Sequence, residues 1–243
     1  MKKILMTLCV VTFSVAAYSQ GFLTWSTSAS AITAQTNSTS ISPLFGGGST
    51  GGGAQGSTIN TAGTLFYYEL LFNTSFNGSQ VAGASSPSNS FATLFGGTWL
   101  DTGLSATNAS SAAGRLSPNP GNTGAQVTGW GVGVTNNCVV VGWSANLGTV
   151  WGGVSGVSNL LATTSNFAAG SFFGVSAAGF IAAAGGNPGP AVISSSGQTA
   201  TSQGLPIFSL NTQLYALPVP EPTTIALAGL GGLSLLLFRR RKV

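Results

Sequence analysis

Histidine is absent from this sequence, and charged residues are scarce. The 243 residues contain no His, 7 Lys or Arg and 3 Asp or Glu. A chain without His lacks the general base of Ser and Cys nucleophile triads and the commonest protein ligand of transition metals. So few carboxylates also cannot form the oxygen cluster that Ca²⁺ requires. The sequence therefore predicts no catalytic residues, no bound metal and no cofactor.

The few charges lie mainly at the two ends of the chain. The net charge of +4 arises from terminal Lys and Arg residues, because between Gln20 and Leu217 only Arg115, Glu69 and Asp101 are charged. This central part carries one cation and two anions, which gives a net charge of −1. It has no basic patch, so nucleic acid is excluded as a partner.

Cysteine is nearly absent as well. Cys9 lies in an apolar N-terminal run, which leaves Cys138 as the only other thiol. An internal disulfide in an exported form is therefore impossible. Cys138 lies in a predicted strand, where we expect it to be a small buried hydrophobic residue.

The first 19 residues have the pattern of a secretory signal peptide. Lys2 and Lys3 precede an apolar run over 4–16, and small residues follow it up to Ser19. We expect signal peptidase to cut between Ser19 and Gln20 and the chain to be exported.

Three features follow one another in residues 218–243. The first is the motif Val219, Pro220, Glu221, Pro222, which its prolines hold extended. The second is an uncharged run over 225–238, which as a helix would span about 21 Å and makes a marginal transmembrane segment. The third is the cation cluster Arg239, Arg240, Arg241 and Lys242, which is expected to stop transfer and stay in the cytoplasm.

This order of features resembles the PEP-CTERM sorting signal of exported bacterial proteins. The resemblance is limited to about a tenth of the chain. It implies that an exosortase, a membrane-embedded transpeptidase-like enzyme, recognises Pro220, Glu221 and Pro222. It also implies removal of the helix and tail, and delivery to the cell surface or extracellular matrix. The alternative is a surface protein that the C-terminal helix anchors permanently in the membrane.

Between the two signals, residues 20–63 are rich in Gly, Ser and Thr and predict a flexible linker or turns between short strands. Residues 64–217 contain short apolar runs separated by Gly, Pro and Asn, which predict a mainly β domain, an antiparallel β-sandwich or a jelly-roll-like fold. An irregular β-solenoid is the alternative. The predicted domain organisation is therefore an N-terminal signal helix, the Gly/Ser/Thr-rich region, the β-rich domain and a C-terminal transmembrane helix. The strands are expected at 64–72, 91–100, 127–134, 138–144, 170–181 and 205–215.

Several local patterns add detail. Residues 127–134 and 138–144 flank Thr135-Asn136-Asn137 and predict a hairpin, whereas 101–122 is expected to be loop. Thr149 could begin a helix within 146–163.

The strand at 64–72 has an apolar face that the sequence directs toward the core. Phe66, Tyr68, Leu70 and Phe72 share this face. Glu69 is then left on the opposite and wetter face.

The sequence thus predicts a non-enzymatic structural or adhesive protein of the surface or extracellular matrix. Its polar, charge-poor exterior suits contact with extracellular polysaccharide. An alternative is a glycosidase-like enzyme that uses Glu69 and Asp101, the one pair of carboxylates between Gln20 and Leu217, although nothing in the sequence indicates that the two meet. Another is a carbohydrate-binding module with exposed Trp residues, but core packing is the favoured role of the 5 Trp residues.

Overall fold

The structure is a computed structural model that describes residues 20–26, 34–36, 66–75, 99–108, 116–119, 124–164, 166–193, 204–207 and 212–219. The signal-peptide residues 1–19 and residues 220–243 lie outside this part. The described elements are β1 (Gln20–Ser26), β2 (Ala34–Thr36), β3 (Phe66–Asn73), β4 (Leu100–Asn108), β5 (Leu116–Pro118), β6 (Ala125–Gly131), β7 (Thr135–Ser144), η1 (Ala145–Leu147), α3 (Val157–Thr163), β8 (Phe172–Val175), β9 (Gly179–Ala182), β10 (Ala191–Ile193), β11 (Gly204–Leu205) and β12 (Thr212–Ala216).

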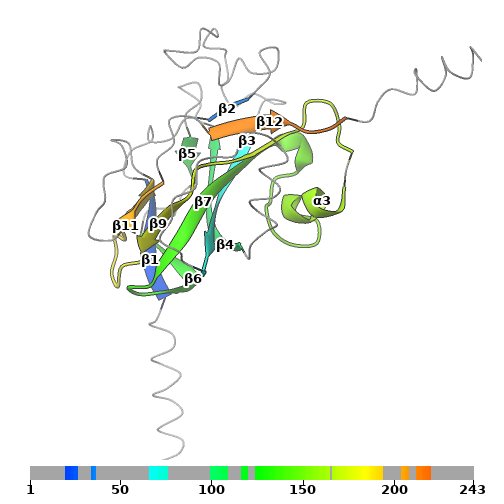
Figure 1. Ribbon diagram of the computed structural model, residues 1–243. Coiled ribbons are helices and arrows are strands. Elements are labelled where there is room, and N and C mark those ends of the chain that lie inside the picture. The colour runs from blue at the N-terminus through cyan, green and yellow to red at the C-terminus, as the bar shows by residue number, and fades with distance from the viewer. Residues whose placement is uncertain are drawn as a thin grey trace, which may run out of the picture.

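The strands form two sheets in which most pairs are antiparallel (Figure 1). The smaller sheet has the order β10-β1-β6. The larger sheet has the order β2-β12-β8-β7-β3-β4-β5, and β9 joins it by pairing with β7 and β11. The pairs of β1 with β10 and of β2 with β12 are parallel. The prediction of a mainly β, antiparallel fold is therefore confirmed.

β7 is the strand around which the larger sheet is built, because it pairs with β3, β8 and β9. Cys138 and Val140 point into one hydrophobic cluster, whereas Val139, Val141 and Trp143 point into another. Both faces are covered, so every residue of β7 after Thr135 is buried. The sequence of a strand that is buried on both faces is a nearly continuous apolar run and does not alternate between apolar and polar residues.

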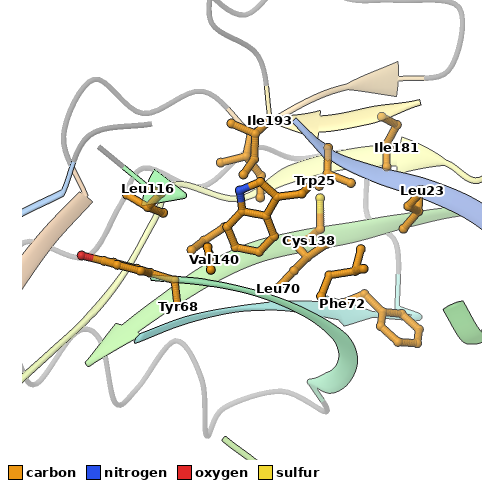
Figure 2. Close-up of a cluster of buried hydrophobic side chains, with 14 of the residues drawn as sticks. Leu23, Trp25, Tyr68, Leu70, Phe72, Leu116, Cys138, Val140, Ile181 and Ile193 are labelled. Carbon is orange, nitrogen blue, oxygen red and sulfur yellow. The ribbon is translucent and has the colours of Figure 1, made fainter. Parts of the chain in front are cut away.

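The first cluster joins the two sheets. Figure 2 shows the indole of Trp25, from β1, above the strand that carries Cys138 and Val140. The predicted inward face of β3 is confirmed, since the apolar residues on it all belong to this cluster: Phe66, Tyr68, Leu70 and Phe72. Gly142 provides space for the ring of Tyr68, because a Cβ at this position would lie 2.7 Å from the Tyr68 Cδ1.

The second cluster covers the opposite face of β7 and includes α3 (Figure 1). Leu71 and Val141 of the sheet pack in it with Trp151 and Leu161. The helix considered within 146–163 is restricted to α3 and begins after Gly156, not at Thr149. Glycines at positive φ, including Gly153 at 89°, interrupt the preceding segment.

The predicted hairpin around Thr135-Asn136-Asn137 is wrong. The turn lies earlier, at 131–134, where the Val134 N–H donates to the Gly131 carbonyl over 3.1 Å. Gly133 has a φ of 73°, which costs a glycine little. β6 then pairs with β1 and β7 with β3, so the two arms belong to different sheets.

The predicted loop at 101–122 is also wrong in part, because β4 and β5 lie within it. Their residues are mostly small and polar, and pairing of β4 with β3 decides their conformation. Pro118 ends β5, the last strand in the order of the larger sheet, where its missing N–H is tolerated. Most of the strand expected at 91–100 lies outside the described residues.

Other boundaries shift without changing the fold class. The strand expected at 170–181 is divided into β8 and β9, and that expected at 205–215 into β11 and β12. The Gly/Ser/Thr-rich region 20–63 contributes β1 and β2, so part of it belongs to the folded domain. Within the described ranges, no helix has the length and hydropathy needed to span a membrane.

Candidate functional site

The two carboxylates of the central chain meet at the junction of β3 and β4. Leu71 is the partner of Asp101 in the strand register, and Glu69 is the partner of Ser105. Two extra residues of β4 therefore bulge between these pairs. Asp101 lies opposite Leu71, which is two residues from Glu69 on β3, so the two carboxyl side chains share one face of the sheet and a hydrogen bond joins them.

The bulge is held by its own polar groups. The Thr102 hydroxyl donates to the Leu70 carbonyl over 2.7 Å and accepts from the Leu104 N–H over 3.0 Å. Gly103 adopts a φ of 74°, as bulge glycines often do. Its N–H donates to Asp101 Oδ1 over 2.8 Å, which orients that carboxyl group.

Glu69 is buried, with 8% of its surface exposed. The prediction that it lies on a wetter, solvated face is wrong, because α3 and the segment before it cover this face with a second hydrophobic cluster. Burial, followed by the neighbouring negative charge of Asp101 and the hydrogen bond to it, raises the pKa of Glu69 to about 9. The Glu69 carboxyl is therefore neutral at pH 7 and donates its proton to Asp101.

Asp101 lies at the surface and closes the pair from outside. A Cβ added to Gly152 would lie 3.5 Å from Asp101 Oδ2, so the loop before α3 passes next to this oxygen.

The contact between the two carboxyl groups limits what they can do. Carboxyl groups that are joined by a hydrogen bond are in direct contact, with no sugar or water between them. Glycosidases hold their two carboxyl groups about 5 to 9.5 Å apart, because a sugar or a water lies between them. The pair Glu69 and Asp101 instead resembles carboxyls that share one proton.

Aromatic side chains lie on the same face of the sheet as the pair, because Tyr67 is two residues from Glu69 on β3 and pairs with Trp143 of β7. The Tyr67 and Trp143 rings are stacked with centroids 6.2 Å apart, and Trp151 lies 5.5 Å from Trp143. All these rings belong to the second cluster or pack against it. The prediction that Trp residues pack in the core is confirmed for the four buried ones: Trp25, Trp130, Trp143 and Trp151.

Cys138 is fully buried and is a free thiol, as predicted. Burial raises its pKa well above the ordinary value. Because the reactive form of cysteine is the thiolate, this side chain acts as a packing residue.

The chain leaves the domain at a well-defined point, which we call the exit. After β12 the Leu217 N–H donates to the Ser171 carbonyl over 2.8 Å, and the Phe167 N–H donates to the Pro218 carbonyl over 2.9 Å. The Leu217 side chain is 3% exposed and lies in the second cluster. Val219, the next residue but one, is 50% exposed.

The residues that begin at the exit match a known family model. Residues 218–242 carry a PEP-CTERM protein-sorting motif. The predicted resemblance is thereby confirmed at the C-terminal end of the chain. The motif implies export and sorting to the cell surface, and processing by an exosortase. No curated protein and no solved structure matches the chain.

The PEP-CTERM motif thus starts at Pro218. The carbonyl group of Pro218 is the last backbone group that the described fold binds. Of its predicted recognition residues, Val219 lies in the described part, at the exit. Pro220, Glu221, Pro222 and the cations Arg239 to Lys242 lie outside it. The sequence did not indicate the residues that hold the exit, Phe167 and Ser171, because their contribution is made by backbone groups that any residue could supply.

Proposed function

We propose that this chain is an exported surface or extracellular-matrix protein of structural or adhesive type, whose mature part is not an enzyme. The observation that carries the proposal is the position of the PEP-CTERM motif. It begins at Pro218, directly after Leu217, which is the last buried residue in the described part of the chain. Cleavage within the motif would therefore release a complete folded domain and remove only the targeting segment.

The N-terminal boundary fits the same proposal. β1 begins at Gln20, and its side chains Leu23 and Trp25 are buried in the first cluster. Removal of residues 1–19 by signal peptidase would keep all of β1 in the mature protein. The two sheets that share this cluster support a β-sandwich architecture for the exported domain.

A non-enzymatic role is supported by the state of the reactive groups. The carboxyl groups of Glu69 and Asp101 are in contact instead of being separated for a substrate. Cys138 is buried and protonated. An outer surface rich in hydroxyl and amide groups suits contact with hydrated polysaccharide, which we propose as the partner of the mature domain.

Intact-mass spectrometry of surface and medium fractions tests the proposal. We expect a major species that begins at Gln20 and ends at Glu221 or Pro222. A major species that retains the cations at 239–242 would contradict it and would show a permanently anchored protein.

A further inference from the structure

We propose that the processing enzyme binds the folded domain as well as the sorting motif, on the surface around the exit. The inference rests on the proposed processing by an exosortase. It names the part of the domain that the enzyme contacts, the exit turn, which we define as Ala168 to Ser171.

The exit turn is closed by a backbone hydrogen bond. The Ser171 N–H donates to the Ala168 carbonyl over 3.1 Å, and Gly170 has a φ of 81°, which is the arrangement of a type II turn. The two hydrogen bonds from Leu217 and to Pro218 lie on either side of this turn. The start of the motif is therefore fixed with respect to the exit turn.

The short distance between the exit and the recognition residues makes contact unavoidable. The fold holds the chain through the Pro218 carbonyl, and the three residues 219–221 can span about 10 Å when fully extended. A folded domain is about 30 Å across. An enzyme that encloses the prolines and Glu221 must therefore meet the domain surface near Pro218.

The surface at this place is suited to close approach. Asn166, Ala168 and Ala169 are exposed beside the exit, and none of them carries a charge. Small side chains allow a partner to reach the backbone closely, and the absence of charge avoids a desolvation cost on contact. The partner that fits is the outward-facing surface of the membrane-embedded processing enzyme.

Adding a charge to this surface, at two spacings between the domain and the motif, tests the inference. Ala169→Arg adds a long charged side chain at the exit, and the matched control Thr128→Arg adds it at an exposed position of β6, in the other sheet. Each variant is made in two forms. One keeps the native spacing between the exit and the motif, and the other carries a Gly/Ser linker of about 12 residues between Val219 and Pro220. The rate of shortening is measured by pulse-chase in a host that carries the enzyme, and melting of the secreted domains checks their folding.

At the native spacing we expect Ala169→Arg to slow shortening about tenfold and Thr128→Arg to leave it unchanged. With the linker, Ala169→Arg should have no effect, and the linker alone should slow shortening about threefold, because the second contact no longer adds to binding. Three results would overturn the inference. They are shortening of Ala169→Arg at the wild-type rate, slowing by Ala169→Arg that is as large with the linker as without it, and faster shortening of the wild type when the linker is added.

The variant Glu221→Ala, measured in the same assay, distinguishes failure of this inference from failure of the proposed function. If Glu221→Ala blocks shortening while Ala169→Arg does not affect it, the exosortase processing stands and the contact at the exit is wrong. If Glu221→Ala is shortened like the wild type, or the wild type is never shortened, both are wrong.

Discussion

Glu69 and Asp101 are hydrogen-bonded side chain to side chain across the bulge between β3 and β4. One of them is buried under the second cluster and the other lies at the surface, so a single proton is held at the boundary between core and solvent. The pair is placed by long-range pairing of strands, and we expect it to make the stability of the domain depend on pH.

We expect the domain to lose stability as the pH rises. The pKa of Glu69 is about 9 in the folded domain, against 4.5 in a free carboxyl group. Between these values the folded state keeps a proton that the unfolded state has released, so the free energy of unfolding falls as pH increases. The stabilising contribution is complete below pH 4.5 and is lost through about pH 9.

At about 1.4 kcal/mol per pH unit, the raised pKa of Glu69 sets an upper limit of about 6 kcal/mol on this loss. Urea unfolding between pH 5 and 9 measures it. Glu69→Gln keeps the shape and the hydrogen bond without an ionisable proton, so its stability should be flat over this range. A wild type as stable at pH 9 as at pH 5 would contradict the prediction.

The pair should have no hydrolytic role. The double variant Glu69→Gln with Asp101→Asn removes both carboxyl side chains, and the described part of the chain contains no other Asp or Glu. We expect identical release of reducing sugar from polysaccharide by the double variant and the wild type, at background level. Activity that is present in the wild type and absent from the double variant would establish the glycosidase alternative.

Gly142→Ala should destabilise the domain by about 1 to 3 kcal/mol, because overpacked cores must shift side chains or backbone. The added Cβ would lie 2.7 Å from Tyr68 Cδ1 and 2.9 Å from Leu214 Cδ2. Thermal and urea unfolding measure the change.

Gly103→Ala is the matched comparison for this variant. Nothing lies within 4 Å of the added Cβ, but the backbone φ is 74°. Its cost should be conformational only, about 1 kcal/mol. Equal stability of Gly142→Ala and the wild type would show that the ring of Tyr68 can move without cost.

The two parts of the sorting motif should fail in different ways. Replacing the cations Arg239 to Lys242 by Gln removes the charge that stops transfer, so unprocessed protein should be released. Glu221→Ala leaves the apolar segment intact, so full-length protein should collect in the membrane. Cell fractionation followed by blotting distinguishes the two. Release of Glu221→Ala protein at the wild-type length would contradict this division of roles.

Sequence patterns predicted the parts of this protein that depend on local order. The alternation in β3 identified which side chains enter the first cluster, and the C-terminal motif was recognised from the order of its three parts. The alternation in β3 did not reveal that Glu69 is buried. That depends on α3 and Trp151, which come much later in the chain and cover the other face.

The errors have the same origin. Asn136 and Asn137 favour turns locally, but Gly133 forms the turn, and pairing with β9 and β3 makes them part of β7. β4 has a composition typical of loops and becomes a strand because β3 offers it a partner edge. Such pairings join residues far apart in the sequence, which short patterns do not encode.

The parallel pairing of β12 with β2 has a consequence for the timing of biogenesis. Thr212 lies opposite Ala34, so the larger sheet joins almost the first and almost the last residues of the domain. A chain that crosses the membrane from its N-terminus cannot complete this sheet until β12 has emerged, when synthesis has reached the sorting motif. Because such distant contacts form slowly, the proposed sorting would let the domain finish folding while the C-terminal segment still holds it at the membrane. Under that proposal, the tail would give the domain time at the bilayer before release.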